Sequence, residues 1–166
     1  MPTTYLSYVA NANTVIGGTG QPSGMAAQLF ERMRSDPLQK RPTVVWSVQL
    51  ANAAQSHCED MVRRGYFSHE SPEGVWPNKR ARLAGYALPD WYLDDKNNIE
   101  SIAGGYTTVD EVWDGWLLSP MHRLHVLGEE SYVSQIYVGC GFFALIDAPL
   151  FDTCWAVVSA PEEVLT

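Results

Sequence analysis

The chain of 166 residues is long enough for one domain with a hydrophobic core, and its 46% hydrophobic and 18% charged residues are globular values, not those of a disordered chain. A formal net charge of −8 disfavours binding to nucleic acid or to an anionic membrane surface, because no basic patch is present to neutralise phosphates. No apolar run approaches the ~20 residues of a membrane span.

The first segment, residues 1–22, is interpreted as an extension of a domain that comprises residues 23–166. Its front part is compatible with a short strand, and the remainder, rich in Gly, Pro and Asn, is typical of a linker. The first fourteen residues lack the basic start and the long apolar middle of a signal peptide.

Three helices are predicted in the first half of the domain. Residues 24–35 place their large apolar side chains on one face. A second helix is expected over about 47–64, with Ser47 as its cap and Gly65 as its stop. A short third helix is predicted over 77–85, where it begins at a proline.

The clearest helical signal follows Thr107. Thr108 and Glu111 have the spacing of a capping box, and Ser119-Pro120 then ends the helix and starts a new turn. Five apolar residues follow the spacing of one helix face: Val109, Val112, Trp113, Trp116 and Leu117. The new turn carries His122 and His125, which makes it a candidate for a site.

Strands are predicted mainly at the end of the chain. Residues 97–105 form a short apolar run, and the longest β-type runs cover about 135–146 and 151–159. The last two can close as a hairpin. Helices that precede such strands indicate helices packed on an antiparallel sheet, which is an α+β architecture.

The three cysteines leave two interpretations open. Cys140 and Cys154 lie on the two last strands, where a cross-strand disulfide is one expectation and two small buried thiols are the other. Cys58 lies in a helical pattern and is expected to be a buried free thiol. None of the three has the spacing of a zinc finger.

Each of the four histidines can be weighed separately. His57 lies on the apolar face of the second helix, which is typical of a hydrogen-bonded core histidine. His69 follows in a short loop, and His122 and His125 can both point at one ligand if their turn is helical. Glu100 interrupts an apolar strand, where a carboxylate is costly unless it meets a partner or a polar cavity.

Several short segments occur in a fixed order, and together they carry a resemblance. They are LANAAQSHCEDM, FSHESPEG, Arg80 with Gly85-Tyr86, IESIAGG, WLLSPMHR, and VGCGF with a strand that contains Trp155. In this order and spacing, residues 24–160 resemble the CAP superfamily of cysteine-rich secretory proteins, venom antigen 5 and plant pathogenesis-related proteins, and in particular its bacterial branch of SCP-like extracellular proteins.

The resemblance implies a three-layer α-β-α sandwich with a mainly antiparallel central sheet and a cleft on one face. In the family two histidines and two glutamates line this cleft, and in some members it binds a divalent metal such as zinc. Carried over, the histidines match His69 and His122 and one glutamate matches Glu100, which gives a predicted metal set of these three residues. The second glutamate is replaced by Ser119, which remains a cleft residue.

Other positions also depart from the family pattern. Ser101 stands where asparagine is usual, and His125 stands where asparagine is often found. Glu70 and Glu111 are the two carboxylates that could compensate for the missing glutamate. The sequence alone does not choose between them.

The chemistry permits catalysis without indicating it. Two imidazoles and a carboxylate can hold Zn²⁺ with one position open for water, but a hydrolase also needs a general base and a donor that stabilises charge. Ser68 and Ser71 beside His69 do not form a triad, because no suitable buried acid is identifiable.

The leading expectation is therefore a non-enzymatic, exported domain that acts outside the cell, in the periplasm or at the cell envelope. Its cleft would bind a divalent cation or a small ligand such as a lipid or glycan, or an extracellular protein. One alternative is a metal-dependent hydrolase of peptide or glycan. The other is a structural or interaction module with no ligand.

Overall fold

The computed structural model describes residues 22–165, so all but the last residue of the predicted extension 1–22 lie outside the described part. The helices and strands follow in the order α2 (Gly24–Ser35), β1 (Val45–Trp46), α3 (Val48–Arg64), α4 (Pro77–Leu83), β2 (Glu100–Gly104), α5 (Val109–Leu118), α6 (Pro120–Val126), the 3₁₀ helix η1 (Glu130–Ser134), β3 (Tyr137–Ala144) and β4 (Thr153–Ala160).

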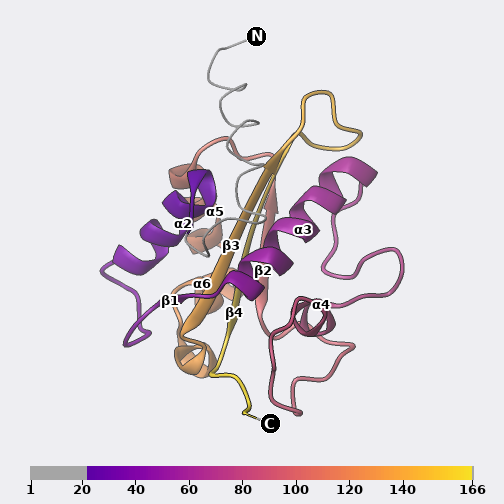
Figure 1. Ribbon diagram of the computed structural model, residues 1–166. Coiled ribbons are helices and arrows are strands. Elements are labelled where there is room, and N and C mark those ends of the chain that lie inside the picture. Colours follow the sequence, from indigo (N-terminus) through magenta and orange to yellow (C-terminus); the bar gives the residue numbers. More distant parts are fainter. Residues whose placement is uncertain (1–21, 166) are drawn as a thin grey trace.

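The sheet and its helices form three layers. The strand order is β1-β3-β4-β2, in which β3 pairs antiparallel with β4 and β2 pairs antiparallel with β4. Helix α3 lies along one side of the sheet, and α2 and α5 lie on the other (Figure 1). The predicted α+β class and α-β-α sandwich are confirmed. The sheet is mixed, because the two-residue strand β1, which was not predicted, runs parallel to β3.

The helix ends occur where the sequence signals place them. The Ser47 hydroxyl accepts a hydrogen bond from the Leu50 amide at the start of α3, and Gly65 ends that helix in the left-handed region with φ 71°. Thr108 and Glu111 form the predicted capping box of α5. Local chemistry therefore fixes both ends of α3 and the start of α5.

Helix α3 approaches the sheet closely because β3 has glycine at two positions that face it. A Cβ atom at Gly139 would lie 1.9 Å from the Ala51 amide nitrogen, and one at Gly141 would lie 2.6 Å from the Ala54 carbonyl carbon. Both clashes are with backbone, which cannot move aside as a flexible side chain can. These glycines set the distance between α3 and the sheet.

Strand β2 forms an edge of the sheet and sends neighbouring side chains to opposite layers. Glu100 pairs with Val158 and lies within 3.9 Å of His57 on α3. Ser101 pairs with Val157 and bonds to His125 on α6. This alternation lets one edge strand contact both helical layers.

Of the two interpretations left open for Cys140 and Cys154, the structure shows the second, two buried thiols without a bridge. All three cysteines are buried free thiols. Cys140 lies opposite Val157 and Cys154 lies opposite Phe143, so the two cysteines are three residues out of register. At ~3.3 Å per residue that offset is about 10 Å, beyond the ~7 Å that a disulfide can span. Burial and a hydrogen bond with Cys154 raise the pKa of Cys58 well above its ordinary value, which suppresses its thiolate.

Among residues 22–165, no helix is both long enough and apolar enough to cross a bilayer.

Replacing Gly139 tests the close approach of α3. Gly139→Ala should lower the free energy of unfolding by roughly 1–3 kcal/mol or more, because the added methyl group meets helix backbone. The matched control is Gly104→Ala on β2, whose Cβ would lie 3.2 Å from the Phe151 ring, a side chain that can shift. Urea unfolding followed by tryptophan fluorescence measures both. Equal effects of the two substitutions would contradict this packing.

The state of the cysteines is tested by thiol titration. Protein unfolded without reductant should show three reactive thiols, the same number as protein that has first been reduced. A count of about one thiol before reduction would mean that two cysteines are bridged.

Candidate functional site

The site is built around the side chain of Glu100, which is only 1% exposed at the start of β2. Asn97 holds the entry to this strand in place. Its Oδ1 accepts hydrogen bonds from the Ile99 and Glu100 amides, at 3.2 and 2.9 Å, and its Nδ2 donates to the Glu100 carbonyl at 3.1 Å. These bonds hold the backbone of Glu100 in place independently of the partners of its carboxylate.

Both carboxylate oxygens of Glu100 have partners. Oε1 accepts a hydrogen bond from His69 Nδ1 at 2.9 Å, and Oε2 accepts one from Arg80 Nη1 at 3.0 Å. Burial by itself raises the pKa of this carboxyl group. The hydrogen bond from His69 and the charges of His57, Arg80 and His69 outweigh burial, so the pKa lies below its ordinary value and Glu100 is ionised at neutral pH.

Arg80 on α4 contacts both the Glu100 carboxylate and the loop that carries His69. It neutralises Glu100, and its Nη2 donates to the carbonyls of His69 and Val75 at 2.7 and 3.1 Å. From the other side, His57 Nε2 donates to the Ser68 carbonyl at 2.8 Å. The loop that carries His69 is thus held by hydrogen bonds from both α3 and α4. His57 is the hydrogen-bonded core histidine that its position in α3 predicted.

The hydrogen bond to Glu100 also fixes the tautomer of His69. An ionised carboxylate can only accept, so the shared proton resides on His69 Nδ1. In the neutral ring this leaves the lone pair on Nε2, and the side chain is 34% exposed. His69 therefore presents one oriented imidazole nitrogen that Glu100 does not use.

His122 belongs to the same neighbourhood, although it comes from the helical layer on the other side of the sheet. Its Nδ1 lies 2.7 Å from the Ser119 hydroxyl, at the junction of α5 and α6. Burial lowers the pKa of His122, and the nearby charge of His69 lowers it further. The two rings are thus within electrostatic reach of each other, and His122 is neutral at neutral pH. Ser119 lies beside His122, and the charge of His69 acts on His122.

His125 has a different environment from His69 and His122. It is buried between the Ser101 hydroxyl, 2.6 Å from Nδ1, and the Ser159 hydroxyl, 2.8 Å from Nε2. Burial, together with the charge of Arg41, places the pKa of His125 well below its ordinary value. This neutral ring ties α6 to β2 and β4, and in doing so it positions His122 on the same short helix.

Glu100 does not have the position of a metal ligand that the resemblance implied for it. Glu100 is buried and both of its oxygens are occupied, so it orients His69 instead of facing a ligand itself. Within the part of the chain described, 22–165, no group of three His, Cys, Asp or Glu side chains is arranged to hold a metal ion. Glu111 does not replace the missing glutamate, because its carboxylate caps α5 through Thr107 and Thr108.

Sequence reasoning did not assign a site role to Arg80. The sequence did contain grounds for such a role, because a buried carboxylate at Glu100 requires a cation and Arg80 belongs to the ordered set of motifs. Which of the eleven Lys and Arg residues supplies that cation depends on how α4 packs beside β2, and spacing alone does not reveal this.

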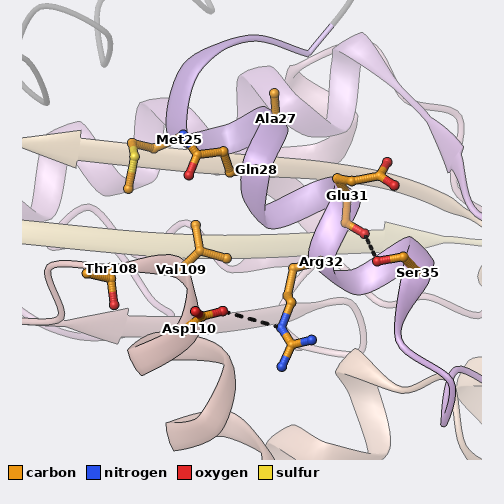
Figure 2. Close-up of a pocket in the computed structure, with 9 residues that line it drawn as sticks. All are labelled: Met25, Ala27, Gln28, Glu31, Arg32, Ser35, Thr108, Val109 and Asp110. Atoms are coloured by element: carbon orange, nitrogen blue, oxygen red, sulfur yellow. Dashed lines mark hydrogen bonds and ion pairs between the residues drawn. The ribbon is translucent and has the colours of Figure 1, made fainter.

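A separate cleft of about 630 Å³ lies between α2 and the start of α5 (Figure 2). Its lining combines apolar side chains with the ion pair between Arg32 Nε and Asp110 Oδ1 at 3.7 Å. The residues are Met25, Ala27, Gln28, Glu31, Arg32, Ser35, Thr108, Val109 and Asp110. None of the predicted site residues lines this cleft, so it is distinct from the histidine site.

Comparison with known proteins identifies the family of this chain and gives solved structures with a similar fold. The family model of the cysteine-rich secretory protein family, CAP, matches residues 28–142. The chain therefore belongs to the CAP family. Comparison with curated proteins gives no match.

Two solved structures share the fold. An extracellular protein containing an SCP domain from Bacillus anthracis str. Ames is 23% identical with a TM-score of 0.64, over 84% of this chain and 41% of that protein. An outer surface protein from Borrelia burgdorferi is 16% identical with a TM-score of 0.60, over 81% of this chain and 91% of that one. The chain thus spans less than half of the Bacillus protein.

The pairing of Glu100 is tested by removing its charge. Glu100→Gln should lower the free energy of unfolding at pH 7 by about 3–5 kcal/mol, because Arg80 loses its buried partner. A carboxyl group whose folded pKa lies below its unfolded value of 4.5 stabilises the protein above that pH, and this stabilisation is lost as the pH falls through the folded pKa. The difference between wild type and variant should therefore shrink below pH 4.5.

The matched control is Glu31→Gln, the same chemical change in an ion pair with Arg34 whose carboxylate side chain is 57% exposed. It should change stability by no more than about 0.5 kcal/mol. Urea unfolding across the acidic pH range measures both variants. A Glu100→Gln protein as stable as the control would overturn this account of the buried pair.

Proposed function

We propose that this chain is an exported CAP-domain binding protein whose cleft at the edge of β2 holds a divalent cation through Nε2 of His69 and of His122. The observation that carries the proposal is the hydrogen bond from His69 Nδ1 to the buried Glu100 carboxylate, at 2.9 Å. Such a carboxylate behind an imidazole fixes the ring and raises its basicity, an arrangement common in metal sites. Ser119 has the same place behind His122.

The donor set suits a borderline cation such as Zn²⁺ more than Mg²⁺ or Ca²⁺, which prefer oxygen ligands. When bound, the ion would supply Lewis acidity toward an oxygen donor of a ligand. Two imidazoles leave the other coordination positions to water or to that ligand. His69 and His122 would hold the ion, while Glu100, Arg80 and Ser119 keep the two rings oriented.

Binding is favoured over hydrolysis by the state of the carboxylate. Glu100 is ionised, but its side chain is only 1% exposed and its oxygens are directed to His69 and Arg80, so it does not face a water that it could activate. Ser119 stands where the family has its second glutamate, and a serine hydroxyl is no general base at neutral pH. At the family's two glutamate positions, Glu100 and Ser119, the site therefore has orienting groups and no carboxylate that faces a bound water.

The proposed location rests on family membership and on the comparison structures. The CAP family is named for secretory proteins, and the two fold relatives are described as an extracellular protein and an outer surface protein. A place outside the cell or at the cell envelope follows by analogy. A cation-dependent binding role suits such a place, because an exported domain meets lipids, glycans and other proteins there.

Zinc titration calorimetry tests the cation site. Wild type should bind Zn²⁺ more tightly than Mg²⁺, and a His69→Ala/His122→Ala double variant should lose the zinc binding. Glu100→Gln should weaken zinc binding by roughly 10–100-fold through the loss of ring orientation. Circular dichroism confirms that each variant is folded.

The control for this titration is Glu31→Gln, which removes a carboxylate far from the histidines and should bind Zn²⁺ as wild type does. Equal binding by the double variant, or no binding by wild type, would refute the cation site. The second result, together with a large loss of stability in Glu100→Gln, would identify the polar cluster as a purely structural device.

A further inference from the structure

A second hollow lies between the loop that follows α4 and the helix η1. Its volume is about 270 Å³, just below the ~300–1,000 Å³ typical of drug-sized ligand sites, so it has room for one ring-sized group. Its lining consists of Trp91, Tyr92, Asn98, Ser131, Tyr132 and Gln135. None of the histidines and glutamates of the proposed cation site belongs to it.

The lining combines aromatic side chains with uncharged polar ones. Three of the six side chains are aromatic, and the other three carry a hydroxyl or an amide group. None is charged, on a chain whose formal net charge is −8. A hollow of this kind has nothing with which to hold an ion, but it offers ring faces together with hydrogen-bond donors and acceptors.

Trp91 is the exposed part of the hollow. The residue is 77% exposed, although tryptophan usually buries most of its surface. Its ring centre lies 6.3 Å from that of Tyr92, with the rings tilted by 39°. An open aromatic ring beside polar groups offers a ligand an apolar face together with hydrogen-bonding groups.

The floor of the hollow is already organised by hydrogen bonds. Gln135 Nε2 donates to the Tyr92 hydroxyl at 3.1 Å and to the Asn98 carbonyl at 2.9 Å, while its Oε1 accepts from Ser159 at 2.6 Å. The Tyr132 ring packs edge-on against buried His125, with ring centres 5.0 Å apart. Because these groups are held by the core, a ligand would not have to order them, which lowers the cost of binding.

We infer that this hollow binds one sugar ring of a neutral glycan. A pyranose ring presents an apolar face of C–H bonds and a rim of hydroxyl groups. The face matches the open ring of Trp91, and the rim matches the hydroxyl and amide groups of Ser131, Tyr132 and Asn98. The glycan site is separate from the cation site and does not depend on a bound metal.

Nuclear magnetic resonance in the presence of a chelator tests the inference. The indole N–H signal of Trp91, identified by its absence in Trp91→Phe, is followed during titration with cellotetraose and with chitotetraose. At least one of the two sugars should shift this signal in a saturable way at millimolar concentration. A response to chitotetraose alone would assign the site to N-acetylated sugars.

Variants then connect binding with the hollow, and their sugar affinity is measured by titration calorimetry, because a variant without Trp91 has no indole signal at that position. Trp91→Ala should weaken sugar binding by roughly tenfold or more, since aromatic anchors dominate such contacts. Tyr132→Phe keeps the ring against His125, removes only the hydroxyl and should weaken binding by a smaller factor. The matched control is Leu118→Ala, which truncates a side chain that is 86% exposed on α5 and should leave binding unchanged.

The outcome is independent of the cation site. The His69→Ala/His122→Ala double variant should bind sugar as wild type does, so failure of one proposal leaves the other intact. The inference is overturned if neither sugar moves the Trp91 signal, or if Trp91→Ala binds as tightly as wild type.

Discussion

The structure around the site depends on one buried charge. Glu100 has almost no contact with solvent, and an ionised carboxylate in that position is tolerated only when cations and hydrogen-bond donors surround it. Arg80 and His69 meet this requirement directly, and His57 lies 3.9 Å away. Because these partners come from α4, a loop and α3, the need to pair one carboxylate joins three segments to the edge strand β2.

The edge position of β2 explains how side chains of both helical layers contact one strand. Glu100 is directed to the layer of α3, whereas Ser101 is directed to the layer of α6. Glu100 holds His69 by a hydrogen bond. His125, which is bonded to Ser101 and Ser159, holds α6 against the sheet and thereby positions His122 on the same helix. A central strand would have another strand beside it, and the two layers could not approach each other around its side.

Buried polar groups also connect the two proposed sites without merging them. From Ser101 the hydrogen bonds run through His125 and Ser159 to Gln135, the floor of the aromatic hollow. Such a fully bonded network gives a rigid and unique arrangement, since a partly bonded one would be costly. The same core thus positions the helix that carries His122 and the amide beneath the proposed sugar ring, while the two surfaces differ in charge and chemistry.

The sequence by itself determined the main helices and the three longer strands, but not β1. The cap of α3 at Ser47, the capping box at Thr108 and the Ser119-Pro120 break are local effects, so spacing was sufficient to predict them. Tertiary structure alone decided the strand register that separates Cys140 from Cys154 and the choice of Arg80 as the partner of Glu100. It also decided the gathering of Trp91, Tyr92 and Tyr132 around one hollow. These outcomes depend on contacts between segments distant in the chain, and local periodicity carries no information about such contacts.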